Sequence, residues 1–297
     1  MNKDFRGCEA RTAADAGEAL RRYGVTILRD AFDPNDVADL LSRADEHRRR
    51  LHRAAADGTA ANLDLPSWYG FAPRSLACDV TALDPLTAGQ STDFDRTSLW
   101  RAMAATVGPV IAAAVGPGAR WTRARGRVVV PELEHGRNGQ LDLHVERTAF
   151  DHESLHNIWL PLLGADEIAN ATTPGLQFYI GRLDFFRAFN EETKPQIYKY
   201  LETIGEQTLL PDPAGDDGGF FYRPEMQTGD VAIFSGVVPH ASCIPPTATQ
   251  SRVGCDIRIF PDNDANRRAM PQFAQAPLRV KLPAWPSPER QDCDAGA

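Results

Sequence analysis

Two histidines and one acidic residue have the types and spacing of a metal site. One residue separates His144 from Glu146, so on a strand both side chains point to the same face and can bind one ion together. A second imidazole, for which His240 is the candidate, completes a set of two nitrogens and one carboxylate. Such a set leaves three positions open on an octahedral Fe(II), and O2 activation requires them because O2 and a reductant bind beside the substrate.

The His-x-Glu pattern also has a purely structural interpretation. A chain with 7 histidines and 40 acidic residues contains about one His-x-acid triplet by chance. In that interpretation Asp142, His144 and Glu146 lie on the exposed face of an ordinary strand. Asp142 points to the same side as Glu146 and is therefore its rival as the carboxylate ligand.

The segment around His240 adds a second pattern. A Gly-Asp turn precedes the apolar run 231–234, His240 follows, and Arg252 begins a strand over 252–260. We expect these parts to form one hairpin that places Arg252 beside the ion bound by His240. A guanidinium there can hold the distal carboxylate of a dicarboxylic 2-oxo acid through two hydrogen bonds, while the oxo-acid end chelates the iron.

Local patterns predict the elements that position these residues. A helix over 13–23 ends at Gly24 and is followed by a strand over 25–28, and a second helix begins at Asp33-Pro34 and extends to about residue 56. Further helices are predicted over 98–114 and within 183–209. Short strands punctuated by Gly, Pro and Asp are typical of a jelly roll or barrel, and they are predicted at 127–130, 157–162, 175–180, 231–234 and 253–260.

With these residues the chain resembles the phytanoyl-CoA dioxygenase-like family of Fe(II)/2-oxoglutarate-dependent oxygenases. The resemblance covers about residues 16–260 and is carried by five segments in order, 23–34 (YGVTILRDAFDP), 143–146 (LHVE), 157–162 (NIWLPL), 173–177 (TPGLQ) and 229–258. It implies that the metal ligands are His144, Glu146 and His240. It also implies that Arg252 binds 2-oxoglutarate and that Ser242 hydrogen-bonds the same carboxylate. The family usually has Asp where this chain has Glu146.

The resemblance implies a mainly β fold with flanking helices. Its core is a double-stranded β-helix, a jelly roll of the cupin type, with an N-terminal helical layer. One domain over 1–297 is expected, with a helical part over 1–117, the β-helix core over 118–262 and an irregular tail over 263–297. The cofactor is Fe(II), with 2-oxoglutarate and O2 as cosubstrates, and the implied reaction couples decarboxylation of 2-oxoglutarate to oxidation of a C–H bond.

Substrate specificity is expected from the loop 58–96 and the insertion 183–222. Their aromatic and acidic residues suit a sugar-containing or aminated natural product, and they are Trp68, Tyr69, Phe71, Phe185, Phe186, Asp216 and Asp217. We therefore expect oxidative tailoring by hydroxylation, ring closure or desaturation. Arg258 shares a strand face with Arg252 and is either a second contact for cosubstrate or substrate or a salt-bridged surface arginine. Trp159 is expected in the core.

The alternative function is a cupin-type metal-dependent isomerase or lyase, or a non-catalytic metal-binding barrel. Such proteins need no arginine for 2-oxoglutarate, so Arg252 distinguishes the two hypotheses.

Composition narrows the class of protein. The 297 residues are 42% hydrophobic and 24% charged, which is typical of a soluble globular chain. A net charge of −8 argues against nucleic-acid binding, and the lack of an 18-residue apolar run argues against a membrane span. Five cysteines without a CxxC pair argue against a disulfide framework or zinc ribbon, so we expect a cytoplasmic protein. The expected partner is a small molecule, and nothing indicates an oligomeric state.

Overall fold

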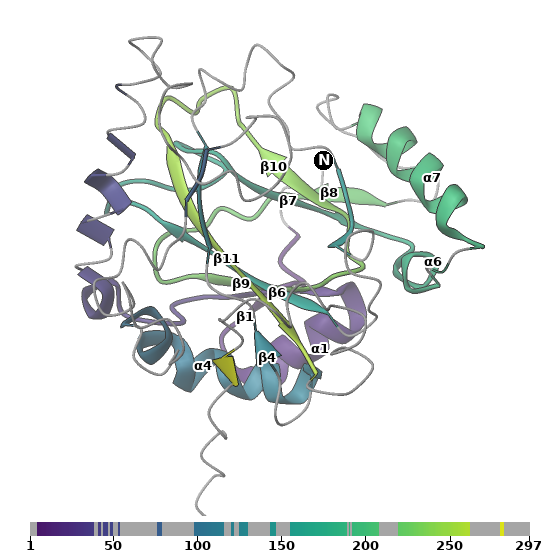
Figure 1. Cartoon of the computed structure of the whole chain (residues 1–297), viewed down its shortest axis with the longest axis horizontal. Coiled ribbons are helices and arrows are strands. Elements are labelled where there is room, and N and C mark those ends of the chain that lie inside the picture. The colour runs from purple at the N-terminus through teal and green to yellow at the C-terminus, as the bar shows by residue number, and fades with distance from the viewer. Residues whose placement is uncertain are drawn as a thin grey trace, which may run out of the picture.

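The described elements form two β-sheets with helices on their outer sides (Figure 1). The structure is a computed structural model, and it describes residues 5–38, 41–42, 44–46, 48–49, 53, 76–78, 98–115, 120–121, 125–129, 143–146, 155–188, 190, 192–207, 219–261 and 280–281.

Helix α1 (Ala13–Tyr23) has the limits that the sequence predicts. The Thr12 side chain caps its start by accepting from the backbone N–H of Asp15 at 3.2 Å. Gly24 ends it in the left-handed region at φ 74°, where its N–H donates to the carbonyl of Leu20. A side chain at Gly24 would also meet Val238, since a Cβ there would lie 2.5 Å from that residue's Cγ2. Strand β2 (Val25–Leu28) follows directly.

The predicted helix start at Asp33-Pro34 is correct, but its first turn is tighter than expected. Residues Pro34–Val37 form a 3-10 helix, η1, and the Asp33 side chain accepts from the backbone N–H of Asn35 only two residues on. The described residues from 38 to 53 are helical. Helix α4 (Ser98–Val115) ends one residue later than predicted.

The larger sheet has nine strands within the described residues. Its order is β1 (Glu9–Ala10), β2, β9 (Val231–Ser235), β6 (His156–Leu162), β11 (Arg252–Phe260), β4 (Arg120–Trp121) and β12 (Val280–Lys281), while β5 (Arg125–Val129) pairs with β11 and β3 (Leu76–Cys78) pairs with β5. Neighbours are antiparallel except β1 and β2.

The smaller sheet consists of β10 (His240–Cys243), β7 (Gly175–Ile180) and β8 (Phe220–Tyr222), with β7 in the centre. The hairpin predicted around His240 is therefore wrong. Strands β9 and β11 lie in the larger sheet with β6 between them, whereas β10 lies in the smaller one. The cause is a tight turn after β9, in which the N–H of Val238 donates to the carbonyl of Ser235 at 3.0 Å and takes the chain across to the other sheet.

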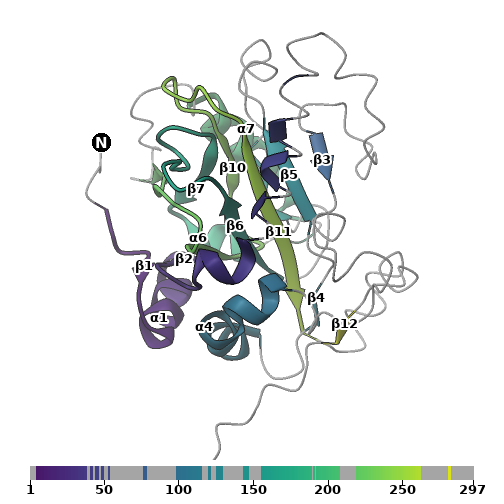
Figure 2. The ribbon, with the colours of Figure 1, turned by 90° about the vertical axis from the view of Figure 1, so that its left-hand side faces the viewer.

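Three apolar clusters define the layers of the molecule. Between the two sheets lie Val25, Ile27, Trp159, Leu176, Phe178, Ile180, Tyr222, Ala232 and Phe234, among others. The opposite face of the larger sheet packs on α1 and α4 through residues such as Leu20, Val107, Val110, Ile158, Leu160, Ile233, Val253 and Ile257. Both helices lie against that face in Figure 2. Strand β6 is apolar on both faces because it is covered on both.

Two helices lie in the segment predicted to be helical between 183 and 209. They are α6 (Leu183–Arg187) and α7 (Lys194–Gln207), and both lie on the outer side of the smaller sheet (Figure 1). Tyr179 of β7 packs with Phe186, Ile197 and Leu201 there. In the described part of the chain, no helix combines the length and the apolar character that crossing a membrane needs.

Candidate metal centre

His144 and His240 are joined through their backbones. The N–H of His144 donates to the carbonyl of His240 at 3.1 Å, and the N–H of His240 donates to the carbonyl of His144 at 2.9 Å. The strand expected at His144 is thus a single antiparallel bridge rather than a regular strand. Because β10 begins at His240, the smaller sheet supports both residues. Their ring centroids lie 4.3 Å apart.

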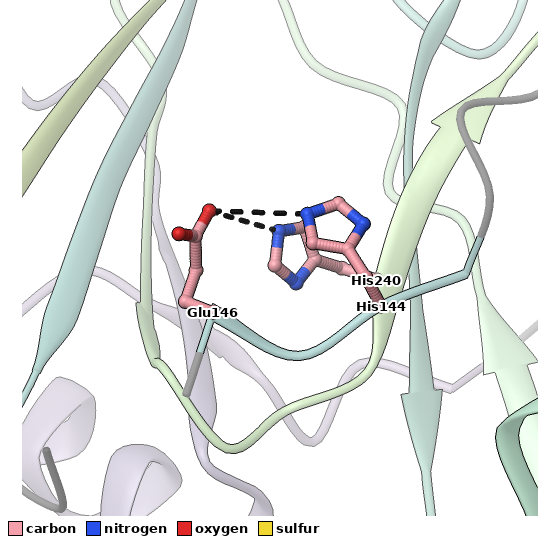
Figure 3. Close-up of side chains that lie close together, drawn as sticks. All are labelled: His144, Glu146 and His240. Carbon is pink, nitrogen blue, oxygen red and sulfur yellow. Dashed lines mark ion pairs between the residues drawn. The ribbon is translucent and has the colours of Figure 1, made fainter. Parts of the chain in front are cut away.

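The carboxylate of Glu146 points at both imidazoles (Figure 3). Its Oε1 lies 3.9 Å from Nε2 of His144 and 3.8 Å from Nε2 of His240. Val145 lies between the two ligand candidates in sequence and packs in the opposite direction, in the cluster with Phe186. The alternation predicted for these three residues is therefore present even though the strand is not.

The three donor atoms fit one ion. They all lie within 4.8 Å of one another, and ligands at right angles about 2.1 Å from an ion lie about 3 Å apart, so side-chain shifts of about 1–2 Å complete the set. Among the described residues, no other group of His, Cys, Asp and Glu side chains has this geometry. Two imidazole nitrogens and one carboxylate oxygen suit Fe(II) with open positions.

His240 is held in the form that binds a metal. Its Nδ1 lies 2.9 Å from the carbonyl oxygen of Val238, so Nδ1–H donates there and Nε2 keeps its lone pair toward Glu146. Burial, reinforced by the neighbouring His144, lowers the pKa of His240 to about 3. The imidazole is therefore neutral at pH 7, and no proton has to leave it when a metal binds.

Glu146 is ionised although it is buried. Only 6% of the residue is exposed, and burial alone would raise the pKa of its carboxyl. Arg258 of β11 and then His144 outweigh that effect, so the pKa of Glu146 lies well below its ordinary value. Arg258 donates from Nε to Oε2 at 2.9 Å and from Nη2 to Oε1 at 3.1 Å. It is thus neither a surface arginine nor distant from the centre.

Arg252 begins β11 and is 1% exposed. Its Nη1 donates to the carbonyl of Gly175 at 2.8 Å, and its guanidinium carbon lies 5.1 Å from the ring centre of Trp159. Gly175 pairs with Cys243, three residues beyond His240, which is about 10 Å along the strand. Arg252 therefore faces the histidine strand from the opposite sheet rather than along a shared hairpin.

Ser242 and Asn157 place buried polar atoms between the two sheets. Ser242 follows His240 by two residues on β10 and so shares its face, and Asn157 of β6 is the register partner of Arg258. Ser242 Oγ and Asn157 Nδ2 are among the buried atoms of the described residues that have no hydrogen-bond partner. Buried donors without partners are costly. Carboxylate oxygens accept from donors of this kind, so these residues fit an anionic ligand between the sheets.

Trp159 has a contact that the sequence alone did not indicate. It is buried in the core as predicted, but its ring also packs against the guanidinium of Arg252. Gly254, two residues along β11, leaves room for the ring, because a Cβ there would lie 2.8 Å from the indole nitrogen. The sequence feature that could have indicated this contact is the alternation along β6, which directs Asn157 and Trp159 to the face opposite Ile158.

Several predicted contacts fall outside the described residues. They are Asp142, the rival ligand, and the specificity candidates Trp68, Tyr69, Phe71, Asp216 and Asp217. Phe185 and Phe186 are described, and both pack against Tyr200 of α7, with ring centroids 5.5 and 5.8 Å away.

No protein-family model matches the sequence, and a sequence search of curated proteins finds no relative. Solved structures do match in fold. AviO1 from Streptomyces viridochromogenes Tue57 is 17% identical over 85% of this chain and 96% of its own, with a TM-score of 0.53. SnoK, described as a non-heme alpha ketoglutarate dependent carbocyclase from nogalamycin biosynthesis, is 11% identical over 84% of this chain and 86% of its own, with a TM-score of 0.51. The chain therefore shares its fold with AviO1 and SnoK over most of its length.

Proposed function

We propose that this chain is an Fe(II)- and 2-oxoglutarate-dependent oxygenase that acts on a C–H bond of a small molecule. The observation that carries the proposal is the convergence of His144, Glu146 and His240 on one point, with a buried arginine facing them from the other sheet. The fold shared with SnoK, whose description names alpha ketoglutarate dependence, supports it.

In this proposal the protein supplies three metal ligands and leaves the remaining coordination positions open. Nε2 of both histidines and Oε1 of Glu146 hold the ion on one side, so three of six octahedral positions remain for other ligands. When bound, iron and 2-oxoglutarate supply oxidising power from O2, with succinate and CO2 as coproducts. The neutral state of His240 and the ionised state of Glu146 prepare the ligands for this role.

Arg252 and Ser242 bind the distal carboxylate of 2-oxoglutarate. Arg252 is almost fully buried, and its planar guanidinium can donate two parallel hydrogen bonds to a carboxylate. Ser242 Oγ lies on the same inner face as His240 and adds a third donor. The oxo-acid end of the cosubstrate then reaches toward the metal ligands. This need for an arginine favours the oxygenase over a cupin-type isomerase, lyase or non-catalytic barrel.

We further infer that the two sheets are the two halves of a double-stranded β-helix. Antiparallel strands cross between sheets at the turn before His240, as a jelly roll requires, and the core between the sheets is continuous. Helices α1 and α4 then form the N-terminal helical layer over residues 1–117, and the whole chain forms one domain.

The proposed substrate is a small natural product, and the outcome is hydroxylation, ring closure or desaturation. The description of SnoK as a carbocyclase of nogalamycin biosynthesis supports this class.

The test does not require knowledge of the substrate. Oxygenases of this kind turn over 2-oxoglutarate slowly without a substrate, so the protein is incubated with Fe(II), ascorbate and 2-oxoglutarate in air and succinate is measured. We expect succinate from the wild type and from Glu225→Ala, which removes an exposed carboxylate, and none from Glu146→Ala. Absence of succinate from wild-type protein that has bound Fe(II), with a panel of natural products added, would refute the proposal.

A further inference from the structure

We propose that Arg258 is a positioning residue that makes Glu146 a one-oxygen metal ligand and so keeps the coordination positions beside it open. The inference rests on the proposed metal centre and goes beyond it, because it assigns a task to a residue that does not itself bind the ion.

The two oxygens of Glu146 have different surroundings. Oε1 faces both imidazoles, at 3.9 Å from His144 Nε2 and 3.8 Å from His240 Nε2. Oε2 accepts from Nε of Arg258 at 2.9 Å, and Oε1 accepts from Nη2 of the same guanidinium at 3.1 Å. The two-pronged contact therefore fixes the carboxylate plane in the orientation in which Oε1, and not Oε2, faces the two imidazoles.

The ion pair between Glu146 and Arg258 is shielded from water, so its hydrogen bonds can fix the orientation of the carboxylate. The side chains of Glu146 and Arg258 are 8% and 13% exposed, so water does not replace these hydrogen bonds as it does at a surface. A two-pronged contact between a guanidinium and a carboxylate also fixes relative orientation, which a single bond does not.

Within the described residues, the strand pairing nearest to Glu146 is two residues away. The described segment 143–146 is joined to the smaller sheet by one bridge, at His144, and two residues later there is no strand pairing within the described residues. Arg258 lies on β11, which is paired on both sides in the larger sheet. The ion pair therefore connects Glu146 to a strand that is paired along both of its edges among the described residues.

The length of the Glu146 side chain is a second reason why this residue needs restraint. Glutamate has one more rotatable bond than aspartate, so an unrestrained Glu146 can present either or both oxygens, and ordering it costs side-chain entropy. Carboxylates bind metal ions through one or two oxygens. With two oxygens bound, only two octahedral positions remain, which is too few for a chelating 2-oxo acid and O2 together. Restraint by Arg258 removes that state.

If the ion pair between Arg258 and Glu146 only stabilises the fold, a different result is expected. In that case, replacing Arg258 lowers the stability of the fold but leaves the way in which Glu146 binds a metal unchanged. Metal affinity and coordination geometry, measured on folded variants, therefore distinguish positioning from stabilisation.

The experiment uses Co(II) as the probe, with wild type, Arg258→Met and Arg258→Lys, and with Arg223→Lys as the control, because Arg223 is a partly buried arginine that donates to Gln177 and not to Glu146. Thermal melts establish folding, chelator-buffered titration gives the Co(II) affinity, and crystal structures of the Co(II)-loaded proteins give the number of bound oxygens. We expect one bound oxygen of Glu146 in wild type and Arg223→Lys. In Arg258→Met we expect both oxygens bound and an affinity changed on the order of 10- to 100-fold, with Arg258→Lys intermediate.

A double-mutant cycle with Glu146→Asp tests whether the two residues act together. The shorter carboxylate reaches Arg258 less well, so Arg258→Met should change Co(II) affinity by less than about 3-fold in the Glu146→Asp background. Unchanged affinity and one-oxygen binding in Arg258→Met overturn the inference. Should that variant not fold, Arg258→Lys decides on the same two measurements. Wild type that binds Co(II) as described but makes no succinate with Fe(II) refutes the proposed function alone, whereas failure to bind Co(II) refutes both.

Discussion

His144 and His240 form an antiparallel bridge in which they exchange both of their backbone hydrogen bonds. In such a pair the Cα atoms lie about 5.5 Å apart and the side chains emerge side by side. The spacing of the two imidazoles is therefore set by the backbone and not by contacts between the rings. Any residue other than proline can make the same backbone bridge at either position.

It follows that the histidines can be removed without unfolding the protein. We expect His144→Ala and His240→Ala to fold with cooperative melts close to that of the wild type, and to lose Fe(II) affinity on the order of 100-fold or more. Anaerobic equilibrium dialysis measures the affinity. His156→Ala serves as the control, because His156 begins β6 and lies outside the donor set. Wild-type iron stoichiometry in either ligand variant would contradict the assignment.

Arg252→Lys separates cosubstrate binding from metal binding. Lysine keeps the charge but cannot donate two parallel hydrogen bonds, so we expect 2-oxoglutarate binding to weaken by about 1–3 kcal/mol, roughly 5- to 150-fold, with Fe(II) affinity unchanged. Isothermal titration of 2-oxoglutarate into metal-loaded protein measures this. The control is Arg223→Lys, since Arg223 is a partly buried arginine that donates to the Gln177 side chain. Equal 2-oxoglutarate affinities in both variants would place the carboxylate site elsewhere.

Cys8 links stability to alkaline pH. Burial, and secondarily Glu9, raises the pKa of its thiol from 9.0 to about 12. Between those values the unfolded chain loses the proton and the folded chain keeps it, so the free energy of unfolding falls as pH rises above 9, by at most about 1.4 kcal/mol per pH unit.

Urea unfolding of wild type and Cys8→Ala at pH 8 and pH 10.5 measures this effect. The stability difference between the two proteins should shrink at the higher pH, because the variant lacks the titrating thiol. In the native state at pH 8, Cys8 should also resist alkylation by iodoacetamide, as expected of a thiol that stays protonated. A difference that is constant with pH would show that Cys8 titrates normally.

The local elements of the fold were predictable because their signals are local. Thr12 and Gly24 mark the ends of α1 through contacts within five residues, and Asp33-Pro34 marks the next helix in the same way. Strand existence was also predictable, since β7 begins and ends at the residues that the sequence indicates. The alternation of side chains along the chain correctly predicted that Val145 points to the side opposite His144 and Glu146.

Pairing between distant segments was not predictable from spacing. Nothing in the sequence near His240 indicates that β10 pairs with β7, about sixty residues earlier, so proximity along the chain wrongly suggested a hairpin with β11. The partner of Arg258 was missed for the same reason, because Glu146 lies 112 residues away. The alternation of side chains along β11 predicted which face of the sheet Arg258 points to. Which residue it contacts depends on how the two sheets assemble.

The contact between Trp159 and Arg252 depends on the absence of a side chain at Gly254. A Cβ there would lie 2.8 Å from the indole nitrogen and 3.2 Å from two ring carbons, so Gly254→Ala must displace the ring from the guanidinium. We expect a loss of about 1–3 kcal/mol in stability from overpacking and weaker 2-oxoglutarate binding, with Fe(II) affinity retained.

Gly17→Ala is the matched control, because Gly17 lies inside α1 and the nearest atom to its added Cβ is an arginine nitrogen 3.6 Å away. That change should stabilise the protein by about 0.5–1 kcal/mol through higher helix propensity. Urea unfolding and 2-oxoglutarate titration of both variants measure the effects. If Gly254→Ala binds 2-oxoglutarate as tightly as Gly17→Ala does, the indole has no part in placing Arg252.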